Sequence, residues 1–279
     1  MESWWSQTIV QPFEQFVNGY QTSSNRRSTA ACKSRESLAT RTGLCNLERH
    51  LNHRTFPRYI IDLRERCKVI DVSDNEIETV PNEVNELAKC TKFVMMRNSL
   101  QTMPRTLNMV TLKVLNVSHN KLKVLSALEL PNLIELVCDG NEIQELPSMN
   151  KLKKLEIFSA SDNMLTDVTA LSVCFSLAEV DLRRNRLGAI PSEFAFLRNI
   201  RRLRLDGNKK IKTIEKDVFL NCVHLEELTM KDTAVMAEDL RSVEGFAEYD
   251  NRRQRKVDKK IKGRVMLENC MDDGLERKV

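Results

Sequence analysis

Cysteine and histidine are the residues of this chain best suited to metal binding or nucleophilic chemistry. The 279 residues include eight Cys and four His. The tightest grouping of both types is Cys45, His50, His53 and Cys67, and its spacing matches no common zinc pattern. Residues 1–5 lack the basic and apolar segments that begin a secretory signal. We therefore expect free, buried thiols, no disulfide framework and no bound metal.

Motifs that hold nucleotides or catalytic metals are absent from the sequence. It contains no G-x-x-x-x-G-K-[ST], no G-x-G-x-x-G and no H-E-x-x-H. The His residues are scattered, and His119 and His224 each stand directly before an expected structural residue. We expect that the protein is not an enzyme and uses no cofactor.

Positive charge is concentrated near the C-terminus. Lys and Arg exceed Asp and Glu by 44 − 39 = 5, and residues 252–264 contain eight basic side chains and one acidic one. One interpretation is a solvated helix that ends the fold. The other is a tail that binds an acidic surface such as tubulin, nucleic acid or anionic lipid. The basic residues are Arg252, Arg253, Arg255, Lys256, Lys259, Lys260, Lys262 and Arg264.

Apolar runs are short throughout the chain. None approaches the roughly 18–20 residues of a membrane-spanning helix, so we expect no transmembrane segment. We predict a cytoplasmic protein and leave nuclear, cytoskeletal or mitochondrial association open. Near the N-terminus, Trp5, Ile9, Phe13 and Phe16 recur at helical spacing. This arm folds back on the rest of the chain, binds a partner, or is a mitochondrial presequence, which its nearby basic residues favour and its acidic residues oppose.

The elements that position these residues follow from an internal repeat. Apolar residues stand eight, five and three positions before, and two positions after, an Asn that recurs every 21–23 residues. Around Asn120 they are Leu112, Leu115, Val117 and Leu122. Each L-x-L predicts a short strand, and each Asn is expected to turn inward and bond backbone groups at a bend. The ladder residues are Asn75, Asn98, Asn120, Asn141, Asn163, Asn185 and Asn208.

The pattern L-x-x-L-x-L-x-x-N-x-L over residues 44–245 resembles the leucine-rich repeat family. The resemblance implies an α/β solenoid, with a curved parallel sheet on its concave face and short helices or turns on its convex face. Pro stands six residues after the Asn in four units, as in the short intracellular class. The units at Asn120 and Asn163 lack that Pro and resemble the repeats of phosphatase regulators.

We divide the chain into three parts on this basis. Residues 1–42 are expected to form an N-terminal arm and a flexible linker, and 43–245 about eight repeats with an N-terminal cap. Residues 246–279 are expected to form a capping helix and the basic tail. The motif Glu244-Gly245-Phe246 with Tyr249 is similar to the ends of small cytosolic members of the family.

The family resemblance places partner binding on the concave face, at the positions six, four and two before each Asn. There we predict an apolar strip next to an Arg-rich patch, a pairing typical of interface anchors. The predicted partner-binding residues are Val94, Met96, Val114, Asn116, Val137, Ile157, Asp181, Arg183, Arg202 and Arg204. We expect a protein scaffold or adaptor. The alternatives are a structural subunit of an axoneme, cytoskeletal complex or ribonucleoprotein, and a phosphatase regulatory subunit.

Overall fold

The computed structural model describes residues 29–47 and 54–262. The chain separates into two compact units, Met1–Lys33 and Ser34–Val279, and all of the repeats lie in the second. The N-terminal arm and Arg264 therefore fall outside the described residues. We expected a flexible linker up to residue 42, whereas Thr29–Thr42 form helix α2.

Helix α2 is explained by its composition and its end. The segment contains Ala, Lys, Arg, Glu and Leu with no Gly or Pro, so its helix propensity outweighs its Ser and Thr residues. It ends at Gly43, whose φ of +74° is the left-handed conformation of a helix C-terminus. The Gly43 N–H donates to the Ala39 carbonyl at 2.8 Å. A Cβ at this position would lie 2.1 Å from the Arg66 carbonyl oxygen, so glycine is required.

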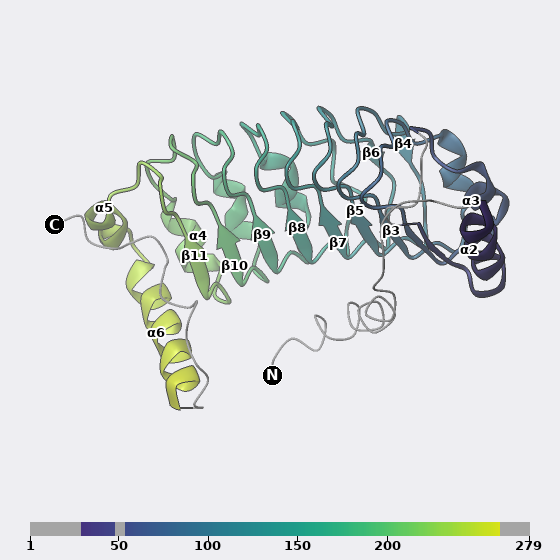
Figure 1. Cartoon of the computed structure of the whole chain (residues 1–279). Helices are drawn as coiled ribbons and strands as arrows, with labels where there is room; N and C mark the ends of the chain where they lie inside the picture. The colour runs from purple at the N-terminus through teal and green to yellow at the C-terminus, as the bar shows by residue number, and fades with distance from the viewer. Residues whose placement is uncertain (1–28, 48–53, 263–279) are drawn as a thin grey trace. The chain divides into compact units, whose positions relative to one another are not determined.

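Nine parallel strands form the main sheet, in the order β1-β2-β3-β5-β7-β8-β9-β10-β11. Each is a triplet whose central residue points inward and whose outer two point to the concave face, as the repeat predicts. The order of strands follows the order of repeats, which is the architecture of a leucine-rich-repeat solenoid (Figure 1). The strands are β1 (Leu44–Asn46), β2 (Val69–Asp71), β3 (Lys92–Val94), β5 (Val114–Asn116), β7 (Glu135–Val137), β8 (Ile157–Ser159), β9 (Glu179–Asp181), β10 (Arg202–Arg204) and β11 (Glu227–Thr229).

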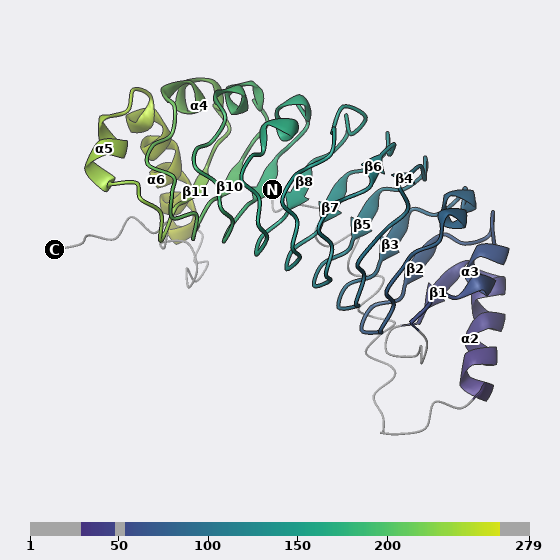
Figure 2. The same ribbon diagram turned by 90° about the horizontal axis from the view of Figure 1, so that it is seen from above.

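The convex side carries short, varied segments (Figure 2). Two neighbouring repeats pair their convex segments as β4 (Thr106–Leu107) and β6 (Ala127–Leu128). The segment after Asn141 contains only an isolated bridge between Val124 and Glu145, and the remaining ones form helical turns, of which η2, η3 and α4 pack in sequence. They are α3 (Arg58–Asp62), η1 (Asn82–Glu86), η2 (Thr169–Val173), η3 (Ser192–Phe196) and α4 (Lys216–Asn221).

The core is one continuous column of the residues that the repeat points inward. The central strand residues are at most 2% exposed, and Phe93 and Phe158 take the place that Leu, Ile, Val or Cys fills in other repeats. No repeat could bury these side chains by itself, so adjacent repeats stabilise each other. This dependence makes the ends of the solenoid the places where a cap is needed.

At the C-terminal end, α5 (Ala237–Ser242) and α6 (Phe246–Lys262) cover the last repeat. Phe219 of α4 packs against Phe246 and Tyr249, with ring centroids 5.6 and 5.7 Å apart. Phe246 and Tyr249 are 7% and 2% exposed. The first turn of α6 therefore packs on the apolar C-terminal end of the repeat stack.

Candidate functional site

The ladder asparagines hold the bends that set the shape of the concave face. Asn120 Nδ2 donates to the carbonyls of Val117, Ser118 and Met95 at 2.9, 3.1 and 3.0 Å. Its Oδ1 accepts the N–H of Leu100 at 3.0 Å. From Asn98 to Asn208, each Oδ1 accepts the N–H two residues after the preceding Asn. Each amide thus bonds its own repeat and the one before it.

The terminal repeat replaces Asn with Thr233. Its hydroxyl donates to the Met230 carbonyl at 2.8 Å, the same bond that a ladder Asn makes three residues back. Asn75 begins the ladder by donating to the Leu47 carbonyl at 2.9 Å. The bends from Asn75 to Asn208 are therefore held in one series of hydrogen bonds, and Thr233 closes the last bend within its own repeat.

A second set of hydrogen bonds, which we did not predict, lies in the turns that return from the convex side to strands β5, β7, β9 and β10. Thr111, Asn132, Ser176 and Asn199 each stand nine residues before a ladder Asn. Their side chains donate to backbone carbonyls of the preceding repeat at 2.8–2.9 Å. A search for a second polar period at the same spacing would have found these residues.

The predicted apolar strip on the concave face is broken by polar neighbours in register. Val114 lies between Lys92 and Glu135 of the adjacent strands. Ile157 lies between Glu135 and Glu179. In the next row, Val94 and Val137 flank Asn116. Asn116 is a predicted contact residue, and it is half-buried. The apolar side chains are therefore single sites on a polar surface.

Two of these residues are covered, contrary to our expectation. Val94 and Val114 are only 6% and 5% exposed. Parallel strands lie about 4.8 Å apart, so side chains of neighbouring strands on the concave face crowd a small residue between them. Met96, Val137 and Ile157 remain half-buried and can contact a partner. The sequence pattern within one repeat cannot predict which of its side chains are buried by side chains of the neighbouring repeat.

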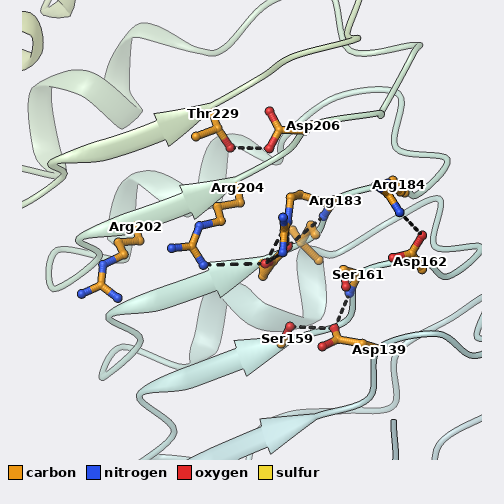
Figure 3. A network of polar contacts seen from close by, with 12 residues as sticks. Asp139, Ser159, Ser161, Asp162, Arg183, Arg184, Arg202, Arg204, Asp206 and Thr229 are labelled. Atoms are coloured by element: carbon orange, nitrogen blue, oxygen red, sulfur yellow. Dashed lines mark hydrogen bonds and ion pairs between the residues drawn. The ribbon is translucent and has the colours of Figure 1, made fainter. Parts of the chain in front are cut away.

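Strands β9, β10 and β11 carry an ordered network of charges (Figure 3). Arg202 contacts Glu179 at 2.6 Å and Glu227 at 3.7 Å, so it bridges the strands on either side of it. Arg204 contacts Glu227 at 2.8 Å and Asp181 at 3.7 Å. Adjacent side chains in the row Glu179, Arg202 and Glu227 therefore carry opposite charges.

Arg183, in the bend that follows β9, also belongs to this network. Its Nη2 lies 2.8 Å from Asp181, whose carboxylate is buried. The hydrogen bond to Asp181 is the main reason that the pKa of Arg183 is raised. All three predicted arginines are thus paired with carboxylates of this chain and held in fixed positions. A partner meets an arranged charge pattern rather than free cations.

Two further carboxylates lie at the bends and were not among the predicted residues. Asp139 accepts the Ser159 hydroxyl at 2.6 Å and the Ser161 N–H at 2.7 Å (Figure 3). Asp206 repeats this arrangement with the Thr229 hydroxyl and the Lys231 N–H. Both stand two residues before a ladder Asn, which is the signal that could have identified them.

Glu135 is the concave carboxyl whose environment changes its acidity. Burial raises the pKa of Glu135, the charge of Lys92 lowers it, and the charge of Glu179 raises it. Lys92 and Glu135 flank Val114 in register, which explains the interaction between their charges. Glu135 is thus a titratable group among the apolar sites, between Val114 and Ile157 in register.

The basic tail is described only in part. Arg253 pairs with Asp250 at 2.9 Å, and Arg255 is exposed. Arg252 is half-buried, and its Nε and Nη2 have no hydrogen-bond partner among the described residues. Helix α6 continues to Lys262. The side chains of Lys256, Lys259, Lys260 and Lys262 lie outside the part of the structure in which side chains are described.

Six cysteines are free and buried in the described part of the chain. Burial raises the pKa of Cys90 to about 12 and that of Cys222 to about 11. The Sγ atoms of Cys45 and Cys67 lie 3.3 Å apart, and this contact together with burial raises the pKa of Cys67. Among residues 29–47 and 54–262, no His, Cys, Asp and Glu side chains are grouped to hold a metal ion.

Comparison with known proteins agrees with this architecture. The family described as "Leucine rich repeat" matches residues 175–235. The chain is 28% identical to plant intracellular Ras-group-related LRR protein 8 of Oryza sativa subsp. japonica over 216 residues, which is 75% of this chain. It is 30% identical to the flightless-1 homolog of Caenorhabditis elegans over 109 residues, or 37% of this chain.

A solved structure shows the same fold. A leucine-rich-repeat protein of Leptospira interrogans superposes with a TM-score of 0.60 at 22% identity, over 77% of this chain and 60% of that one. The chain spans 57% of the length of the rice relative and 9% of the nematode relative. In the described part of the structure, no helix is both long and apolar enough to cross a membrane.

Proposed function

Because this chain carries leucine-rich repeats and folds as a leucine-rich-repeat solenoid, we propose that it is a non-enzymatic scaffold that binds a protein partner on its concave face. Proteins with such repeats generally mediate protein–protein interaction. The observation that supports the proposal is the bridge that Arg202 makes between Glu179 and Glu227 on three adjacent strands. A surface already fixed in this way loses little conformational entropy when a partner binds.

The chemistry of the network defines the partner that fits. Arg202 and Arg204 are partly exposed, so each can add a contact to a partner carboxylate while it keeps its own. Met96, Val137 and Ile157 offer small apolar sites a few strands away. We propose a partner with an acidic group opposite β10 and apolar side chains opposite β7 and β8.

Affinity purification from cell extract tests this function. We expect the Arg202→Glu and Arg204→Glu double variant to lose at least one protein that the unaltered chain retains reproducibly. Arg186→Glu is the matched control, because Arg186 is exposed but lies outside the concave strands. The same set of proteins on all three baits would contradict binding at this face.

Identity and location are further parts of the proposal. The ends of the chain, including Glu244-Gly245-Phe246 and Tyr249, resemble those of the small cytosolic leucine-rich-repeat-containing protein numbered fifty-seven. We propose a cytoplasmic location, supported by the similarity to a plant intracellular protein. We also retain the division into residues 1–42, 43–245 and 246–279. Imaging of the tagged full chain would test the location.

A further inference from the structure

A second exposed surface lies at the turns that return from the convex side to strands β8 to β11. We call residues 151–154, 173–176, 196–199 and 221–224 the return turns. Lys153, Phe175 and Arg198 each stand ten residues before a ladder Asn. The Ser176 hydroxyl donates to the Lys153 carbonyl at 2.8 Å, and Asn199 Nδ2 donates to the Phe175 carbonyl at 2.9 Å. These bonds hold the three residues side by side in adjacent turns.

Large apolar side chains are exposed along these turns. Phe175 is 54% exposed, Phe196 59% and Val223 51%, and Leu220 of α4 is 41% exposed. They are four of the nine exposed large apolar residues in the described part of the chain. Because η2, η3 and α4 pack consecutively, their ends bring these side chains to one side of the solenoid. Apolar residues gathered in this way indicate a contact surface.

Two cations flank the central aromatic ring. Lys153 Nζ lies 5.8 Å from the centroid of Phe175, and Arg198 occupies the equivalent position in the next repeat. Both side chains are exposed, and neither forms an ion pair with any residue of the described part. The arginines of the concave face, in contrast, are all paired. The positive charge of the return turns is therefore available to a partner.

The nearest acidic residues on the same elements lie at the other end of the short helices. Glu193 is in the first turn of η3, whereas Phe196 ends that helix. Asp217 is likewise in the first turn of α4, before Leu220. Each acid thus lies one helical turn before an exposed apolar side chain, on the helix itself and not in the return turns that carry Lys153 and Arg198.

We propose that the return turns bind an acidic segment of a partner protein, which places a bulky apolar side chain against Phe175 and Phe196 and carboxylates against Lys153 and Arg198. This surface is separate from the concave network. Interface hot spots are large side chains in desolvated contacts, surrounded by residues that exclude water, and the exposed Phe175 and Phe196 can supply such contacts.

Other acidic surfaces fit these turns less well. A nucleic acid gains affinity from many phosphate contacts, about six to ten in a strongly salt-dependent complex, whereas three cations of the turns, Lys153, Lys154 and Arg198, make no ion pair within the described residues and only two of them flank Phe175. An anionic membrane gains only about 1 kcal/mol for each Lys or Arg near its surface. Two cations are sufficient for a peptide, in which the apolar side chain supplies the remaining affinity.

Fluorescence anisotropy of the full chain with a labelled peptide tests the proposal. The probe is a twelve-residue peptide of Glu and Asp with one central Phe. We expect saturable binding that weakens about tenfold or more in Phe175→Ser and in the Lys153→Glu and Arg198→Glu double variant. Val110→Ser is the matched control, because Val110 occupies the same repeat position, is 53% exposed and has no flanking cations.

Further measurements make the result decisive. A peptide with Gln and Asn in place of Glu and Asp should bind at least about tenfold more weakly, and circular dichroism should show that each variant remains folded. Equal binding of the neutral peptide, unchanged binding by the folded variants, or no saturable binding would overturn the proposal. So would binding to phosphatidylserine vesicles that these substitutions abolish while the peptide does not bind.

Discussion

The backbone N–H of Leu228 donates a 3.0 Å hydrogen bond to the hydroxyl oxygen of Tyr249. Leu228 is the central residue of β11, the last strand of the sheet. An unpaired N–H at such an edge could pair with a strand of another chain. Tyr249 therefore does more than fill the end of the core, because its hydroxyl also occupies a donor of the open edge.

Removal of that hydroxyl should weaken the C-terminal cap. In Tyr249→Phe the ring can stay packed, but the buried N–H of Leu228 loses its acceptor. We expect the free energy of unfolding to fall by about 1–2 kcal/mol. Urea unfolding followed by circular dichroism measures this change.

Phe246→Leu separates packing from edge protection. It reduces the aromatic cluster but leaves the bond between Leu228 and Tyr249 available, so it should lower stability without promoting self-association. Tyr249→Phe should also increase the dimer fraction in size-exclusion chromatography at high concentration. Identical behaviour of the two variants would argue against a role for the hydroxyl.

The ladder asparagines should be far more sensitive to substitution than other asparagines. Asn120→Ala removes three donated hydrogen bonds and leaves the buried N–H of Leu100 without its acceptor. Each unsatisfied buried group costs about 1–3 kcal/mol, so we expect a loss of at least about 3 kcal/mol. Asn108→Ala is the control, because Asn108 is exposed and its bond to Asn85 uses its backbone N–H. Comparable thermal unfolding of both variants would contradict the ladder's structural role.

The fold could be predicted because the repeat constrains every unit in the same way. The residues five before each Asn must be buried, and these became the strand centres from Ile70 to Leu228. The concave surface was less predictable, because the exposure of Val94 and Val114 depends on side chains of the neighbouring strands. Helix α2 was missed because it follows helix propensity and not the repeat. The pairing of Arg202 with carboxylates on both sides required the register between strands.

Glu135 should make stability depend on pH in an identifiable way. Burial is the main cause of its raised pKa, so the folded state holds this proton more tightly than the unfolded chain, whose value is near 4.5. Ionisation of Glu135 as the pH rises therefore destabilises the folded state, since that state binds more protons. Glu135→Gln cannot ionise. Relative to the unaltered chain, its free energy of unfolding should increase from about pH 4 toward neutral pH and then level off.

Urea titrations at a series of pH values measure this difference. Glu145→Gln is the matched control, because Glu145 is exposed and belongs to the convex segment that follows Asn141. The change for Glu135→Gln should exceed any change that this control shows over the same pH range. If the change for Glu135→Gln does not exceed that of the control, contacts of the ionised carboxylate with Lys92 balance burial, and if the variant loses relative stability as the pH rises, they outweigh it. In that case the carboxylate stabilises the concave face.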